Sequence, residues 1–423
     1  MATTTIFLRR VTLSSVSKPL STQSRGLSAF ISPLYESAGL PDTQPKSKNV
    51  SQPSVTRLEN GVTVVSESSS MVSTITMTYP KAGSNNESVE EFGASIANRF
   101  MSYKSASGLS SFLIFKTFQS SAAIPSFSGG RTSTTLGYTT CREKALDLIP
   151  LLATNSAFED WDVRDALKDV AKEITIAHDA THVVLTEQLF AAAYGPQSAM
   201  GRPYFNSNAS ASAMKSFRAK AYGIHGAVLA ATGIDDHASF CAHVEASLSE
   251  SPPGESSEVP TPVYLGGESR LFVPSVSVPH IALAFPAPAN PVMTHILKEC
   301  FQVQGSSPFY IDGLIGVYGS DVDALSKILA TKPSADTIRR AKALAKAKET
   351  ISFEGAGSVA LAKSMTDQVL ATGGTITSAS FDAVTAQDVS AAYDAMLKAP
   401  LTMASIGNIS MVPYHGSVAS RFS

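Results

Sequence analysis

Charge, cysteine and long hydrophobic runs are all scarce in this sequence. Charged residues make up 16% of the chain and the formal net charge is −2, so the chain lacks the basic excess that attracts nucleic acid. Its three cysteines, Cys141, Cys241 and Cys300, are too widely spaced to indicate a disulfide framework or a zinc knuckle. The best apolar run, 227–231, has only the length of a strand, so no membrane-spanning helix is expected.

Length and apolar content, by contrast, are ample. At 423 residues, of which 43% are hydrophobic, the chain is long enough for two or more domains with large cores. Residues 249–262, SESPPGESSEVPTP, are polar and rich in proline, which predicts a linker. The expected domains are therefore 55–248 and 263–423.

The first 35 residues have the composition of a targeting segment. They contain no acidic residue before Glu36 and are rich in serine and threonine. Their cations are Arg9, Arg10, Lys18 and Arg25. This composition predicts a mitochondrial transit peptide, with a plastid peptide or a disordered basic tail as alternatives. We place the cut after Leu27, which gives a leader of 1–27, and expect 28–54 to form an extended arm.

An apolar strand, 72–79, leads through a small-residue turn, KAGS, into a predicted helix. On that helix Phe92, Ile96 and Phe100 recur every four residues, which places them on one face. We expect this face to be buried. Arg99 is expected at its edge, with the stem packed and the head in water or on a carboxylate.

The pattern starts again after the linker, which indicates an internal repeat. Three segments of the first half match three segments of the second half in the same order. The matching pairs begin at Val72 and Val278, at Thr135 and Ile315, and at Val228 and Thr402. In the second pair, Gly137-Tyr138 is aligned with Val317-Tyr318. Two copies of one strand–helix unit would explain the length of the chain.

Other elements follow from local patterns. Asn60-Gly61 predicts a hairpin. Further strands are expected at 132–141, after a turn at 128–130, and at 225–232. Helices are expected at 142–158, 161–193, 213–221 and 235–248. Residues 112–118 fit either a helix or a strand.

Several segments together resemble the metallopeptidase family that contains pitrilysin and the mitochondrial processing peptidase. They are KAGS with its helix, TRLENGVTVVSES (56–68), EQLFAAAY (187–194), GRPY (201–204) and FYIDGLIGVY (309–318). The resemblance spans about 56–410. It implies an α+β protein of two homologous domains, each an antiparallel β-sheet covered by α-helices, as in LuxS-like metallohydrolases.

Active members of that family carry His-x-x-Glu-His on the helix after KAGS. Residues i, i+3 and i+4 share a helix face, so two imidazoles bind zinc and the glutamate acts on the bound water. This chain has Ile96, Arg99 and Phe100 at these positions. Glu173 stands about where the family keeps its third ligand, and alone it is a relic or a surface acid. The resemblance therefore implies no catalytic residue, no metal and no cofactor.

Within the family, the segments resemble the branch of second core proteins of the cytochrome bc1 complex. That branch implies a non-catalytic subunit of respiratory complex III, peripheral on the matrix side of the mitochondrial inner membrane. The implied partners are a sister core protein 1, similar to the beta subunit of the processing peptidase, together with cytochrome b, cytochrome c1 and small subunits. The complex III dimer and inner-membrane lipids complete the implied surroundings.

Two other functions stay open. The alpha subunit of the processing peptidase also lacks the zinc motif, but it carries a long glycine-rich loop where this chain has only FQVQGSSP (301–308). An active zinc peptidase would have to use His178 and His182, which are four residues apart on an expected helix. Asp179 stands where such a site needs a glutamate, so two unrelated histidines on an exposed turn are the simpler interpretation.

Two further groups could bind a ligand. Cys241 and His243 have the spacing of a metal-binding pair, although a buried thiol near a surface histidine is the simpler interpretation. Five cations lie on one expected helix: Arg339, Arg340, Lys342, Lys346 and Lys348. Such a run is typical of a solvated face, with acidic lipid headgroups or an acidic subunit as the alternative contact.

Overall fold

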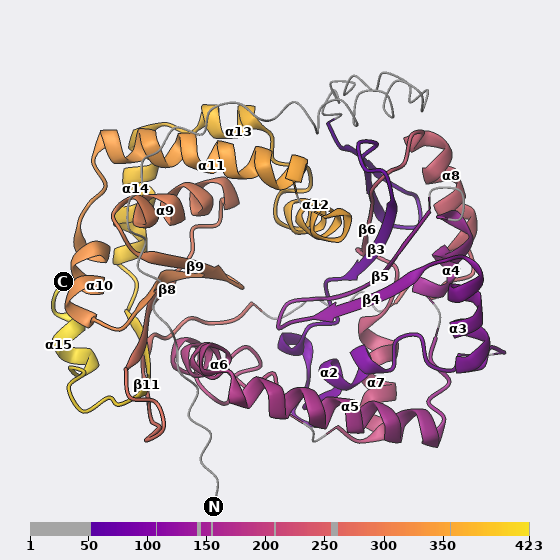
Figure 1. The fold of residues 1–423 in the computed structure, drawn as a ribbon, viewed down its shortest axis with the longest axis horizontal. Helices are drawn as coiled ribbons and strands as arrows, with labels where there is room; N and C mark the ends of the chain where they lie inside the picture. The colour runs from indigo at the N-terminus through magenta and orange to yellow at the C-terminus, as the bar shows by residue number, and fades with distance from the viewer. Residues whose placement is uncertain are drawn as a thin grey trace, which may run out of the picture. The chain divides into compact units, whose positions relative to one another are not determined.

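Two β-sheets built on one plan organise the computed structural model of the chain (Figure 1). The structure describes residues 52–422 apart from 107, 142–144, 154, 207–208, 255–260 and 356. The expected leader 1–27 and nearly all of the expected arm 28–54 lie outside the described residues. Both sheets belong to one contact unit, Val50–Ser423.

The first sheet has six strands in the order β1-β2-β6-β3-β5-β4. Neighbouring strands are antiparallel except β2 and β6, which are parallel. The strands are β1 (Ser54–Arg57), β2 (Thr63–Ser66), β3 (Ser73–Tyr79), β4 (Ile124–Gly129), β5 (Thr134–Thr140) and β6 (Val228–Ala231). The predicted hairpin is confirmed as β1–β2, and Gly61 in its turn has a φ of 86°, which favours glycine.

The second sheet has five strands in the order β7-β11-β8-β10-β9. Only β7 and β11 are parallel. The strands are β7 (Gly267–Phe272), β8 (His280–Pro286), β9 (Ser307–Ile311), β10 (Leu314–Gly319) and β11 (Thr402–Gly407). The order and directions match β2-β6-β3-β5-β4 of the first sheet strand for strand. The predicted repeat and fold class are therefore confirmed, with one parallel pair in each otherwise antiparallel sheet.

The strand register corrects one detail of the repeat. Met77 pairs with Leu136 in the first sheet, and its counterpart Leu283 pairs with Val317 in the second. Val317 therefore corresponds to Leu136, and its predicted alignment with Gly137 is wrong by one residue. Because side chains alternate along a strand, such a shift would put every matched residue on the opposite face of the sheet.

Helices cover both sheets. In the first half they are α2 (Ala94–Phe100), α3 (Ser111–Ser120), α4 (Ile149–Leu152), α5 (Asp160–Asp179), α6 (Thr181–Tyr194), α7 (Ala211–Ala221) and α8 (His237–Ser247). In the second half they are α9 (Pro291–Val303), α10 (Val322–Ala330), α11 (Ala335–Gly355), α12 (Ser358–Thr372), α13 (Ser378–Ala383), α14 (Ala386–Leu397) and α15 (His415–Ala419). Two 3-10 turns, η1 (Ser84–Asn86) and η3 (Leu146–Leu148), complete the elements. None of the helices in the described ranges is long and apolar enough to cross a membrane.

One predicted helix is wrong. Among the described residues of 142–158, helical turns cover only η3 and α4. Pro150 has no backbone N–H to continue a helix through its position, and it instead stands in the first turn of α4. The predicted helical stretch 161–193 is confirmed as α5 and α6, which are separated at Ala180.

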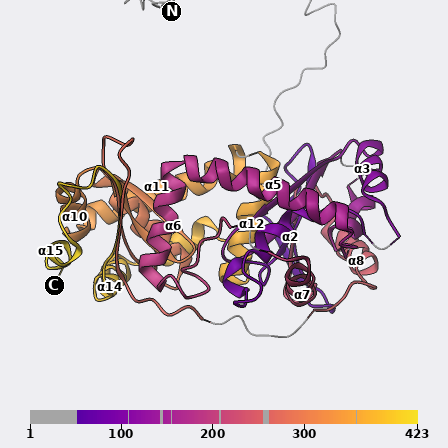
Figure 2. The ribbon, with the colours of Figure 1, turned by 90° about the horizontal axis from the view of Figure 1, so that it is seen from below.

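The two halves exchange one helix each. On the face of the first sheet away from its main core, α12 of the second half packs Leu361, Met365 and Val369 against Val65 and Ala230. Figure 1 shows α12 lying along β6 and β3, and Figure 2 shows it from below. The first sheet is therefore completed by a helix from the far end of the chain.

The reciprocal contact involves α6 of the first half. Its residues Leu189, Phe190 and Ala193 pack against Ala282 and Ile406 of the second sheet. In the repeat, α6 and α12 occupy corresponding places, since each follows a long helix, α5 or α11. In each half, the second helix of this pair thus packs on the sheet of the other half.

Candidate functional site

The helix that would carry the family's zinc site is α2, and its start is fixed by a buried carboxylate. Gly93, with a φ of 88°, turns the chain into the helix. Glu87 accepts hydrogen bonds from the backbone N–H groups of Gly93 at 3.0 Å and Ser95 at 2.6 Å. These bonds satisfy N–H groups that a helix start leaves unpaired. Even so, loss of solvent on burial outweighs them and raises the pKa of Glu87 to about 7.

The two positions of the zinc-binding histidines hold apolar side chains. Ile96 is 1% exposed and belongs to a cluster with Val163 and Val170 of α5. Phe100 is half-buried, and its ring centroid lies 5.7 Å from that of Phe127 in an edge-to-face arrangement. Neither side chain offers a lone pair to a metal, and both contribute to packing between α2 and its neighbours.

The position that the resemblance assigns to a catalytic glutamate holds the cation of an ion pair. Arg99 contacts the carboxylate of Glu173 on α5. The side chains of Arg99 and Glu173 are 9% and 30% exposed. The guanidinium carbon also lies 4.9 Å from the centroid of the Phe100 ring. Glu173, which the resemblance would make a third zinc ligand, is therefore the counter-charge of the arginine, and the pair joins α2 to α5.

The described residues around this ion pair do not provide a set of metal ligands. The hydroxyl of Tyr204 and the Nε atom of Arg99 are buried without a hydrogen-bond partner among the described residues. A Cβ atom on Gly129 would lie 2.9 Å from that hydroxyl and 3.1 Å from Cδ of Arg99, so the space is tightly filled. Burial raises the pKa of Tyr204, which keeps the phenol neutral. Within the described part of the chain, no three His, Cys, Asp or Glu side chains form a group that could hold a metal ion.

A second, buried ion pair lies beside the first. Arg131, in the turn before β5, contacts Glu187 of α6 at 2.8 Å. It also donates hydrogen bonds to the backbone oxygens of Met200 at 3.2 Å and Arg202 at 2.6 Å. Glu187 in turn accepts from the backbone N–H of Tyr204 at 2.8 Å. Arg131 therefore holds together two segments that carry the family resemblance, and the sequence around it offered no signal of this role.

The two histidines of the alternative zinc site do not share a helix. α5 ends at Asp179 and α6 begins at Thr181, with Ala180 in an extended conformation between them. His178 and His182 lie on either side of this break, and both are exposed. The expected spacing of one helical turn is therefore wrong for this pair.

The cations of α11 largely find acids of the same chain. Arg339 and Arg340 both contact Asp336, and Lys348 contacts Glu299 at 2.6 Å. These pairs favour the interpretation as a solvated helix face. Contact of this face with lipid headgroups or another subunit stays a prediction.

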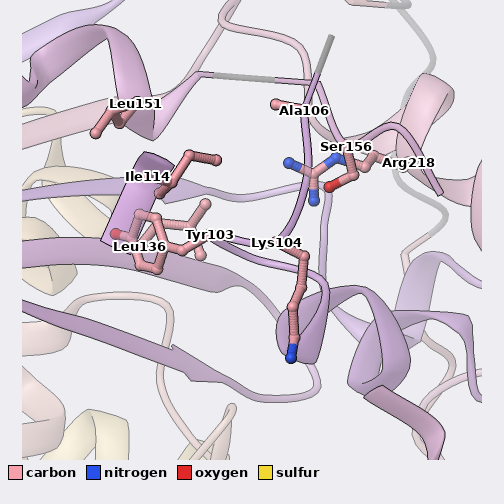
Figure 3. A pocket seen from close by; sticks show the side chains of 8 residues that line it. All are labelled: Tyr103, Lys104, Ala106, Ile114, Leu136, Leu151, Ser156 and Arg218. Carbon is pink, nitrogen blue, oxygen red and sulfur yellow. The ribbon is translucent and has the colours of Figure 1, made fainter. Parts of the chain in front are cut away.

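A cavity of about 10 Å³ lies under α3 and has room for about one water molecule (Figure 3). It is lined by Tyr103, Lys104, Ala106, Ile114, Leu136, Leu151, Ser156 and Arg218. Arg218 is buried, which lowers its pKa, and its guanidinium lies 4.4 Å from the Tyr222 ring centroid. The cavity is too small for a substrate and is part of the core packing.

Comparison with known proteins finds relatives in sequence and a solved structure of the same fold. No family model matches the chain. The alpha subunit of the mitochondrial processing peptidase of Solanum tuberosum is 25% identical over 427 residues, which cover 87% of this chain and 84% of that protein. A probable alpha-2 subunit of Arabidopsis thaliana is 25% identical over 452 residues, 91% of this chain and 89% of that protein.

A solved structure has the same fold over nearly its full length. It is a chain of Complex III2 from Candida albicans with Inz-5 bound, with a TM-score of 0.72 and 17% identity. The match covers 87% of this chain and 99% of that chain. The chain is thus similar in sequence to processing-peptidase alpha subunits and shares the fold of the Complex III2 chain.

Proposed function

We propose that the chain is a non-catalytic core subunit of mitochondrial respiratory complex III, required for assembly and stability of the complex. The observation that carries the proposal is the match to a Complex III2 chain, which spans 99% of that chain. A chain that shares this fold over nearly the whole of a complex III chain has the backbone framework for the same place in such an assembly. The similar processing-peptidase proteins are alpha subunits, so this similarity does not by itself favour catalysis.

The geometry of α2 supports the absence of peptidase chemistry. Ile96 and Phe100 are apolar where zinc ligands are needed, and Arg99 carries a positive charge that would repel the cation. Glu173 is occupied by Arg99. No group at this position can take a proton from a metal-bound water, so a reaction of the family type has neither metal ligands nor a base.

The alternative is an alpha subunit of the processing peptidase, which the sequence relatives favour. Against it stands the short connection after α9. This helix ends at Val303 and β9 begins at Ser307, which leaves three residues between them, 304–306. A long glycine-rich loop of the kind that handles presequences in the alpha subunit has no room here. A core subunit is therefore the better-supported assignment.

The proposed place is the matrix side of the inner membrane, as a peripheral subunit. The described residues contain no helix suited to cross the bilayer, so attachment would go through other subunits and lipid headgroups. The proposed partners are a sister core protein, cytochrome b, cytochrome c1 and the small subunits of the complex III dimer. Permanent interfaces of this kind bury several thousand Å². A subunit that catalyses no reaction contributes to the complex through these interfaces.

Affinity purification of the tagged chain from mitochondrial membranes tests the proposal. Cytochromes b and c1 should co-purify, and deletion of the gene should deplete both haem subunits. Recovery of a soluble heterodimer with a peptidase beta subunit, with normal complex III in the deletion strain, would establish the alternative.

A double variant tests the alternative that the chain is an active zinc peptidase. Replacement of His178 and His182 by alanine removes the histidines that this alternative requires. The double variant should restore complex III in the deletion strain as fully as the wild-type chain. Loss of a presequence-cleaving activity on this change would contradict a non-catalytic role.

A further inference from the structure

A histidine and a cysteine face each other on α8, one helical turn apart. The Nε2 atom of His237 lies 3.5 Å from the Sγ atom of Cys241 and 2.8 Å from the Oγ1 atom of Thr56 on β1. Residues four apart are neighbours on a helix surface, whereas residues two apart point to different sides. The structure therefore replaces the Cys241–His243 pair of the sequence with a different pair, His237 and Cys241.

Ser66 orients the imidazole toward the thiol. Its Oγ atom lies 2.7 Å from Nδ1 of His237, and the Ser66 residue is 3% exposed. We assign the tautomer in which Nδ1–H donates to this hydroxyl, so that the lone pair of Nε2 faces the Thr56 hydroxyl and the Cys241 thiol. Histidines that bind metals usually donate their other ring N–H to a fixed acceptor in this way.

The spacing of the two ligand atoms fits a tetrahedral ion. With a Zn–S distance of about 2.3 Å and a Zn–N distance of about 2.0–2.1 Å, a tetrahedral angle places the two atoms roughly 3.5 Å apart. The observed separation of Sγ and Nε2 is 3.5 Å. Asp236 precedes His237, and Glu245 follows Cys241 by one helical turn, so both acids place negative charge near the pair and favour a cation there.

We propose that His237 and Cys241 form a two-residue chelate for a thiophilic divalent cation, with Zn²⁺ as the representative ion. Binding forms one bond from Nε2 and one from Sγ, and the thiol proton passes to the solvent. Water and the hydroxyl of Thr56 complete the coordination. No residue of this site belongs to the α2 positions where the resemblance would place a zinc site.

Equilibrium dialysis of the reduced full chain against Zn²⁺, followed by elemental analysis, measures the binding. One ion per chain is expected at this site. His237→Ala and Cys241→Ser should each weaken it at least tenfold. His243→Ala, on the same helix, and Cys141→Ser, at an exposed thiol, serve as matched controls and should leave the affinity unchanged.

Alkylation followed by mass spectrometry gives a second readout that also works inside an assembled complex. Zn²⁺ should slow the modification of Cys241 and not that of Cys141, and His237→Ala should remove this protection. The inference is overturned if the wild-type chain binds no ion here, if His237→Ala keeps the protection, or if the control variants weaken binding as much as the site variants.

Discussion

The two partners of the Arg99–Glu173 ion pair should contribute unequally to stability when each is removed alone. The side chain of Arg99 is 9% exposed and that of Glu173 is 30% exposed. Glu173→Ala leaves an almost fully buried guanidinium without its counter-charge. Arg99→Met leaves a carboxylate that can turn toward water, and it puts an apolar chain beside the Phe100 ring.

These exposures set the magnitudes. Removal of one member of a buried pair costs about 3–5 kcal/mol, and the partial exposure of Glu173 reduces the expected cost of Glu173→Ala to about 2–4 kcal/mol. Arg99→Met should cost about 1 kcal/mol or less, since no buried charge is left behind. The double variant Arg99→Met/Glu173→Leu should lie close to the wild type, because apolar replacement of a buried pair is often neutral.

The chain provides its own probe for this measurement. Trp161 is the only tryptophan and lies in the first turn of α5, the helix that carries Glu173. Urea unfolding followed by its fluorescence therefore reports on the helix concerned. Lys172→Ala, which removes an exposed pair with Asp169 on the same helix, is the control and should cost at most about 0.5 kcal/mol. A loss in Arg99→Met equal to or larger than that in Glu173→Ala would refute the reasoning.

Three further outcomes are expected. The triple variant Ile96→His, Arg99→Glu and Phe100→His should bind zinc by elemental analysis without cleaving a basic leader peptide, because no loop presents the substrate; zinc-dependent cleavage would contradict this. Because burial raises the pKa of Glu87 from 4.5 to about 7, the wild type should lose roughly 3 kcal/mol of unfolding free energy relative to Glu87→Gln as the pH rises from 4.5 to 7. Parallel pH profiles of the two proteins would argue against it. N-terminal sequencing of the mature protein should begin at or near Ser28, and a mature form that keeps the first 27 residues would exclude the expected cut.

The strands that are buried on both faces were the elements best predicted from the sequence. Every residue of β3 is buried, so the strand appears as a continuous apolar and β-branched run, and its counterpart β8 repeats it. The edge strand β4, IPSFSG, was not predicted. Ile124 and Phe127 are exposed and Pro125 cannot donate to a ladder, so the segment lacks the alternation that marks a half-buried strand.

Similarity of residue types also misled the alignment of the repeat. Tyr138 and Tyr318 look equivalent in sequence. Tyr138 lies in the main core of the first half, whereas Tyr318 lies on the other face of its sheet, where its ring stacks with His280. The face of a strand residue depends on its register, and cross-strand pairing fixes that register.

The candidate site was predictable along one helix and not between helices. Spacing alone predicted the buried side of Ile96 and the place of Arg99 at its edge. The choice of Glu173 as the partner of Arg99 depends on how α2 packs on α5, which no local pattern reveals. His237 and Cys241 did carry a local signal, since their spacing of four residues places them on one helix face.

The exchange of α6 and α12 couples the folding of each half to the emergence of the other. A chain that leaves a ribosome or a translocation pore N-terminus first exposes Val65 and Ala230 on the open face of the first sheet until α12, which ends at Thr372, has followed. Contacts over such sequence separations form slowly, and uncovered apolar sheet invites aggregation in the meantime. The crossed helices therefore lengthen the time for which the first sheet has an uncovered apolar face, and a truncation that removes α12 from the second half should destabilise the first half as well.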